Sequence, residues 1–149
     1  MNYGYACINM GFSALPTSQR ITTNRTMIKR TFHERGIEYA SELALQNLRD
    51  LHTILEWNLE NDIYFYRLSS DIIPWASEYN LTDMPNFGAS HAAALKAGKF
   101  ARKHGMRLTS HPGPFNKLAS PKERVFQLTK TDLSVHLSLI HISEPTRPY

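Results

Sequence analysis

The chain has 149 residues and a formal net charge of +4, with 17 lysines and arginines against 13 acidic residues. This length suffices for one domain with a sizeable core, but it excludes a complete eight-unit α/β barrel, which needs roughly 250 residues. A hydrophobic content of 42% excludes a disordered chain, and the single cysteine, Cys7, excludes an internal disulfide framework.

The first half of the chain predicts a strand, a long loop, a helix and a second strand. Tyr3–Met10 is rich in aromatic and apolar residues and is expected to be a strand. Gly11–Glu34 is long and mainly polar, which predicts a loop of the kind that often carries function. Apolar residues recur at close to 3.6-residue spacing over Ile37–Glu60, which predicts an amphipathic helix. Ile63–Leu68, with β-branched and aromatic residues, predicts the second strand.

The second half repeats this pattern. After an irregular segment, a helix is predicted over His91–His104, with Gly105 placed to end it. Met106–Thr109 predicts the third strand, and a third helix is expected from Pro121 to about His136. Strands that alternate with helices in this order imply an α/β fold with parallel strands and right-handed crossovers.

His111 follows the third predicted strand and precedes the sharp turn Pro112-Gly113. The carboxyl ends of strands are where α/β barrels place metal ligands and catalytic groups. Ser120 and Glu123 have the spacing of a capping box that would open the third helix. His111 is therefore the candidate reactive residue, whereas His136 is interpreted as a surface or helix-end residue.

The predicted loop is basic. Between Gln19 and Gly36 it carries Arg20, Arg25, Lys29, Arg30 and Arg35 against a single acid, Glu34, with hydroxyl and amide side chains between them. Arginines among small polar side chains suit phosphate contacts, which makes Arg20, Asn24 and Arg25 candidates for DNA binding. A solvated surface loop would show the same composition, and composition alone favours that interpretation.

The last residues, 138–149, do not continue the helical pattern. They resemble the translation of a sequencing adapter, and we expect them to be non-native. The natural domain is then expected to cover residues 1–137. His141 and Glu144 are accordingly not counted as ligands.

Four stretches are informative in their order and spacing. They are Gly4–Met10, Thr22–Thr26, Tyr66–Pro74 and Gly105–Gly113. Together they resemble the N-terminal part of the ultraviolet damage endonucleases, a family of bacterial and fungal DNA-repair enzymes.

The resemblance implies that the chain is the N-terminal portion, about three βα units, of a metal-dependent (β/α)8 TIM barrel. It implies an endonuclease that nicks DNA on the 5′ side of ultraviolet photoproducts and other distorting lesions. Within that family pattern, His111 matches the first metal-binding histidine. Tyr5 and Asn9 match the mouth of the lesion pocket, and Pro114 and Phe115 match residues that probe the duplex opposite the lesion.

Three departures from the family pattern matter. Pro114 lacks the amide that the family often has there, and Glu78 stands where some members carry histidine, which leaves its role open. The family's remaining ligands lie on later strands, so we expect this chain alone to be inactive. The expected partner is damaged double-stranded DNA, and the expected cofactors are divalent ions, Mn²⁺ first and Zn²⁺ or Fe²⁺ as alternatives, bound fully only by the complete enzyme.

The sequence has no apolar run long enough for a membrane span and no signal-peptide pattern, so we expect a cytoplasmic protein, nucleoid-associated if bacterial, without an obligate protein partner. Two alternatives stay open. One is a sugar-isomerase-like or apurinic-endonuclease-like metal barrel, and the other is a non-functional folding remnant of an interrupted gene. DNA binding that weakens steeply with salt would separate a DNA enzyme from a sugar-binding barrel.

Overall fold

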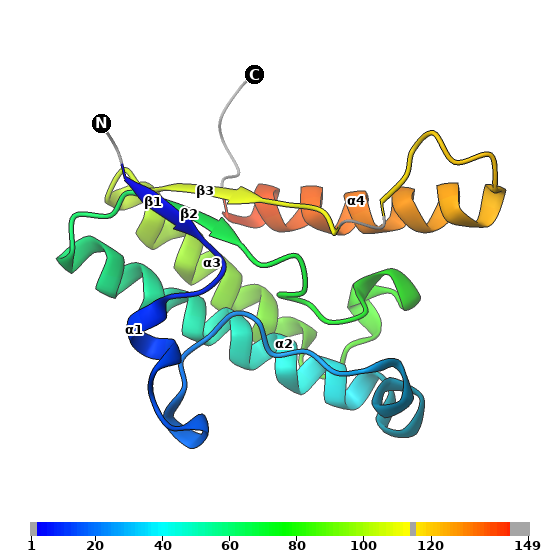
Figure 1. Cartoon of the computed structure of the whole chain (residues 1–149), viewed down its shortest axis with the longest axis horizontal. Coiled ribbons are helices and arrows are strands. Elements are labelled where there is room, and N and C mark those ends of the chain that lie inside the picture. The colour runs from blue at the N-terminus through cyan, green and yellow to red at the C-terminus, as the bar shows by residue number, and fades with distance from the viewer. Residues whose placement is uncertain (1–2, 114–115, 144–149) are drawn as a thin grey trace.

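The computed structural model of the chain describes residues 3–113 and 116–143, with side chains as far as residue 139. Three parallel strands form one sheet in the order β1-β2-β3, namely Gly4–Ala6, Phe65–Leu68 and Arg107–Ser110. Each strand is followed by a long helix, α2 (Lys29–Glu60), α3 (Phe87–Lys103) or α4 (Glu123–Ser143). The prediction of adjacent parallel strands with helical crossovers is confirmed (Figure 1).

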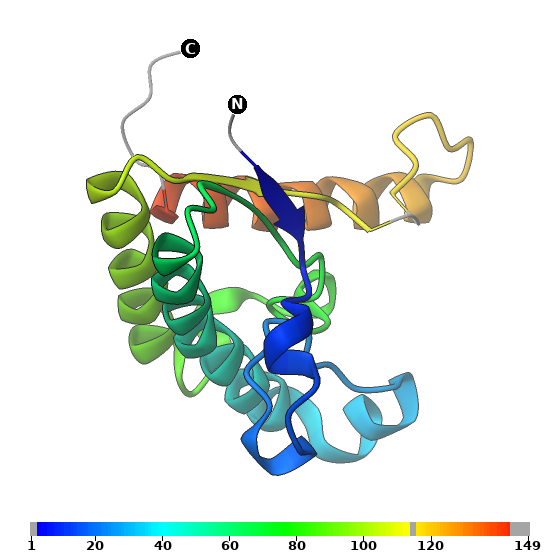
Figure 2. The same ribbon diagram turned by 60° about the vertical axis from the view of Figure 1, so that its left-hand side comes forward.

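The helices cover one face of the sheet. In both views α2 and α3 pack beneath the strands, and α4 runs along β3 (Figures 1 and 2). Side chains alternate accordingly, with Tyr66, Leu68 and Leu108 buried towards the helices. Arg67 and Arg107 lie on the opposite face and are exposed. The described part of the chain therefore has one covered sheet face and one open face.

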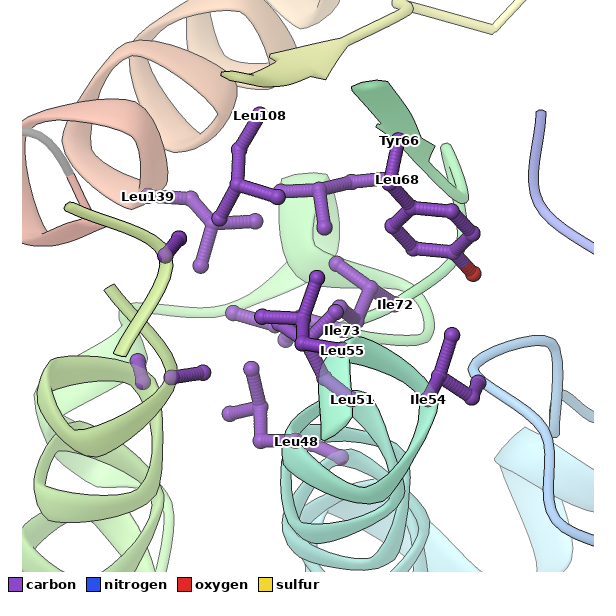
Figure 3. Close-up of a cluster of buried hydrophobic side chains, with 14 of the residues drawn as sticks. Leu48, Leu51, Ile54, Leu55, Tyr66, Leu68, Ile72, Ile73, Leu108 and Leu139 are labelled. Carbon is purple, nitrogen blue, oxygen red and sulfur yellow. The ribbon is translucent and has the colours of Figure 1, made fainter. Parts of the chain in front are cut away.

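The core lies between this covered face and the helices. Leucines and isoleucines of α2 meet the strand residues there, and the main members are Leu48, Leu51, Ile54, Leu55, Tyr66, Leu68, Ile72, Ile73, Leu108 and Leu139 (Figure 3). Truncation of such a buried leucine to alanine typically costs about 2–5 kcal/mol of stability. The core thus fixes the sheet, and with it the strand ends that carry the polar residues.

The first strand is shorter than predicted. It ends at Ala6 because Cys7 adopts a left-handed backbone with φ of 62°. The Asn9 side chain then accepts a hydrogen bond from the Phe12 amide and caps a short helix, α1 (Met10–Ser13). A single 3₁₀ turn, Thr17–Gln19, follows, so the predicted loop contains two small ordered elements.

Both crossover helices α2 and α3 begin earlier than predicted. The helical segment before Ile37 starts at Lys29 and breaks at Gly36, whose φ of 65° and ψ of −161° suit glycine. Helix α3 starts at Phe87 rather than His91. Its end is as predicted, because Gly105 has a φ of 66° and the Met106 amide donates to the Ala101 carbonyl at 2.8 Å.

Helix α4 differs from the prediction at both ends. The Ser120 hydroxyl accepts from the Lys122 amide, and the helix begins at Glu123, so the expected capping box with Pro121 inside the helix is wrong. The helix also continues beyond His136 to Ser143, and Leu139 packs in the core at 3% exposure. The loss of helical structure expected from residue 138 is therefore wrong, while the non-native origin of the tail stays a prediction. None of the helices described is long and apolar enough to cross a membrane.

Candidate functional site

A cleft of about 1180 Å³ lies at the carboxyl edge of the sheet. One wall comes from Thr26 and Met27 before α2. The other walls come from the segment between Ser70 and Ser77, which follows β2, and from the segment between Gly113 and Asp132, which follows β3. In open and closed α/β sheets this edge is where ligands bind, because the βα loops converge there.

The cleft combines charges with an aromatic wall. Asp71 and Asp132 line it together with Lys117 and Lys122. Trp75 adopts a left-handed backbone with φ of 57°, and its indole nitrogen donates to the Met27 carbonyl at 3.0 Å. Lysines beside an aromatic ring suit a ligand that is anionic and contains flat bases.

The Trp75 ring is held by a second aromatic side chain. Phe32, in the first turns of α2, stacks on it with ring centroids 5.3 Å apart and an interplanar angle of 9°. The Tyr79 ring also stacks on the Phe32 ring, with the two ring centroids 6.2 Å apart. The helical segment before Gly36 is thereby fixed against the segment after β2, and the cleft wall is ordered by packing.

His111 lies directly after β3, at the edge where the sequence predicted it, and it is exposed. Its neighbour Ser110 forms a hydrogen bond of 2.5 Å with Nδ1 of His136. Nε2 of His136 lies 3.6 Å from the Asp132 carboxylate. The interpretation of His136 as a surface or helix-end residue is wrong, because the residue is only 6% exposed and α4 continues to Ser143.

Burial is the main cause that lowers the pKa of His136 below its ordinary 6.5, and the nearby charge of His111 acts in the same direction. Asp132 and Asp71 oppose this shift. A neutral imidazole is therefore favoured. Because the Asp132 carboxylate only accepts, Nε2 carries the ring proton, and the Ser110 hydroxyl donates to Nδ1.

The described residues do not form a metal site by themselves. No three histidine, cysteine, aspartate or glutamate side chains among them come together as a set of ligands. His111 and Asp71 are exposed at neighbouring strand ends without a third partner in the part of the chain that the structure describes.

Tyr5 and Asn9 lie together, and neither is among the described residues that line the cleft. The Asn9 amide donates to the Tyr5 hydroxyl at 3.0 Å, and that hydroxyl donates to the side-chain carbonyl of Asn58 at 2.7 Å. Burial raises the pKa of the Tyr5 phenol, so it stays protonated. Tyr5 is paired with Tyr66 in register, which directs its side chain to the helix-covered face. The sequence analysis missed Asn58, although an asparagine at helical spacing from Ile54 and Leu55 was a usable signal, and the structure buries it completely.

The basic loop is partly tied to α2. Arg25 pairs with Asp50, whereas Arg20 is exposed. Asn24 is half-buried, and its side-chain oxygen has no hydrogen-bond partner among the residues described. Glu78 is exposed at the end of a 3₁₀ turn, Ala76–Glu78. Pro114 and Phe115 lie outside the described residues.

Comparison with known proteins identifies relatives along nearly the whole chain. The chain is 37% identical over 133 residues to the UV-damage endonuclease of Schizosaccharomyces pombe. The matched region covers 89% of this chain and 22% of that protein. It is 31% identical over 141 residues to the UV DNA damage endonuclease of Clostridium perfringens, and this region covers 94% of this chain and 31% of that protein. The chain thus spans less than half the length of these relatives.

The solved structures include a close likeness as well. The crystal structure of SacUVDE matches with a TM-score of 0.77 and 27% sequence identity, over 96% of this chain and 46% of that chain. This likeness confirms the predicted fold class, the three βα units being part of a TIM barrel. The model of the UV-endonuclease UvdE family matches residues 1–145, and the chain belongs to this family.

Proposed function

We propose that this chain supplies the first three βα units of a DNA-repair endonuclease that nicks the backbone on the 5′ side of ultraviolet photoproducts and other distorting lesions. The observation that carries the proposal is the family match over residues 1–145, whose members are named for damage by ultraviolet light. The cleft at the carboxyl edge of the sheet supports it, since this is the edge at which barrel enzymes act.

Damaged double-stranded DNA is the proposed partner. Lys117 and Lys122 line the cleft, and the exposed Arg20 lies on the loop that leads to Thr26 at its rim. Cations in this arrangement attract the phosphate backbone, and Trp75 offers a face on which an unstacked base can lie. Unstacking costs least at a damaged step, which is a source of selectivity for lesions.

His111 is proposed as one ligand of a divalent ion, Mn²⁺ first and Zn²⁺ or Fe²⁺ as alternatives. Imidazole suits such ions, and the residue stands at a strand end, two positions before the cleft-lining Gly113. The further ligands would come from other strands of a complete barrel. The chain by itself is therefore proposed to bind DNA without cutting it.

The test is binding of the chain to a short duplex with one thymine dimer and to the same duplex without damage. We expect tighter binding to the damaged duplex, and an affinity that falls steeply between 50 and 200 mM salt. Lys117→Ala with Lys122→Ala should weaken both complexes, and Lys99→Ala, on the exposed side of α3, is the matched control. Equal affinity for both duplexes, or no dependence on salt, would refute the proposal.

A further inference from the structure

One face of α4 is polar where a helix packed beside a strand would normally be apolar. Thr129, Asp132 and His136 follow one another at spacings of three and four residues, so they share a helix face. Thr129 and His136 are buried, with exposures of 2% and 6%. Each of the three side chains forms a hydrogen bond with a different residue of the segment that runs from the end of β3 to α4.

The first contact fixes the chain just before His111. His136 accepts the hydroxyl of Ser110, the last residue of β3, and Asp132 lies beside the opposite ring nitrogen. The ring is therefore held at both nitrogens. Because Ser110 is adjacent to His111 in the chain, its position sets the direction in which the turn leaves the sheet.

Two further contacts fix the chain after the turn. The Asn116 side chain donates to Asp132 at 2.5 Å and to the Gly113 carbonyl at 3.2 Å. The Lys117 amide donates to the Thr129 hydroxyl at 3.0 Å, and that hydroxyl donates in turn to the Val125 carbonyl. The same helix face thus holds the chain on both sides of His111–Gly113.

Burial of polar side chains costs free energy unless each is bonded, and packing alone would be served better by apolar residues. The bonds of all three residues converge on one turn. We propose that Thr129, Asp132 and His136 are positioning residues that hold the His111–Gly113 turn at the rim of the cleft. The importance of this turn for DNA cutting rests on the function proposed above, but its positioning can be measured separately.

The test is NMR relaxation of the 149-residue chain and its variants. In the wild type we expect rigid backbone amides at His111 and Gly113, with order parameters of about 0.85. Ser110→Ala and Asp132→Ala should lower these values to below about 0.6 and raise amide exchange at Asn116 and Lys117 at least about fivefold. Amides of the core strand β2 should keep their wild-type values.

Two variants separate positioning from general stabilisation. Asp132→Asn keeps an oxygen that accepts from Asn116, so it should restore exchange at Asn116 and Lys117 to within about twofold of the wild type. Ser134→Ala removes an exposed hydroxyl bond on the same helix and should change nothing in the turn. If Asp132→Ala does not fold, the inference is tested by the backbone order measured in Ser110→Ala and by the amide exchange measured in Asp132→Asn.

Unchanged order at His111 and Gly113 in Ser110→Ala would overturn the inference. So would an equal loss of order in β2, because the polar face would then serve the fold as a whole. Binding of the dimer-containing duplex is a separate readout. A wild-type chain that shows a rigid turn but no preference for damage refutes the proposed function and leaves the positioning role in place.

Discussion

Asp50 of α2 and Arg25 of the preceding loop form an ion pair, with Nη1 and Oδ2 2.7 Å apart. The guanidinium also donates to the carbonyls of Thr22 and Arg20, each at 2.7 Å, while the Asp50 carboxylate accepts the Thr22 amide. One arginine thus closes the loop on itself and ties it to the helix. This arrangement gives Arg25 a structural role whether or not it also meets a phosphate.

Arg25→Ala should therefore lower the stability of the chain. It leaves two carbonyls without their donor and removes the cation beside the Asp50 carboxylate, which keeps only the Thr22 amide, at a cost of about 1–3 kcal/mol. The measurement is urea denaturation followed by circular dichroism. Arg30→Ala, which breaks an exposed pair with Glu34, is the control and should cost less than about 0.5 kcal/mol.

The same variant tests the DNA-contact prediction for this loop. If Arg25 neutralises one phosphate, its loss should flatten the salt dependence of duplex binding by roughly one unit of slope. Asp50→Asn disturbs the ion pair but keeps the arginine, so it should destabilise the loop without flattening that slope. A stable Arg25→Ala variant with a flattened slope would contradict the structural role.

Asp62 ends α2 in the same way that Gly105 ends α3. Its φ is 56°, and the Ile63 amide donates to the Asn58 carbonyl at 2.9 Å, which is the bond that closes this type of helix end. Asp62→Gly should stabilise the chain by up to about 1 kcal/mol, because glycine adopts this backbone without strain. Thermal unfolding measures the effect.

Asp62→Ala and Gly105→Ala complete the comparison. Alanine has the same steric conflict as aspartate and lacks its local hydrogen bonding, so Asp62→Ala should not stabilise. Gly105→Ala should lose about 1–2 kcal/mol, since a side chain is placed where φ is 66°. A glycine at position 62 that destabilises the chain would show that the left-handed backbone there carries no strain.

The succession of strands and helices along the chain was predictable because hydrophobic periodicity changes between about two and 3.6 residues. The early end of β1 was not predictable, because it depends on the left-handed backbone of Cys7, and cysteine is not a residue type that indicates this conformation. The start at Lys29 was hidden by Gly36, which interrupts the helical pattern without ending the helical course of the chain. Local backbone conformation thus set the boundaries that periodicity could not.

The site was predictable only at the strand ends. His111 follows a strand in the sequence, and parallel topology brings residues in such positions to one edge of the sheet. Lys117 and Lys122 line the cleft because residues 116–122 pack against α4, as the bond from the Lys117 amide to Thr129 shows. The role of His136 is hidden for the same reason, because the sequence shows a polar helix face without its partner strand.

Gly4→Ala should destabilise the first strand. A Cβ at this position would collide with the carbonyl oxygen and side chain of Phe65 on β2, and the backbone oxygen has no room to yield. We expect a loss of at least about 2 kcal/mol, with β1 amides exchanging faster than those of β3. Gly88→Ala, in open space on α3, is the control and should be neutral or stabilising.

Acidification should destabilise the chain through His136, which is buried, and His52, which is half-buried. Burial is the main cause that lowers the pKa of both His52 and His136 from 6.5, with Lys96 acting in the same direction on His52 and His111 on His136. Glu56 and Asp132 oppose these shifts. Below pH 6.5 the unfolded chain binds protons that the folded chain does not, so stability falls as the pH drops towards the lowered values.

This dependence is measured from the urea midpoints at about pH 7.5 and about pH 5, which lie on either side of the ordinary histidine pKa. His52→Leu removes a titrating ring whose Nδ1 is buried with no hydrogen-bond partner among the described residues, so the midpoint of this variant should change less with pH than that of the wild type. His136→Gln should flatten the dependence as well. His91→Gln, at an exposed position, is the control and should keep the wild-type behaviour. A midpoint that rises on acidification would mean that both rings gain protons on folding, against the burial that the structure gives them.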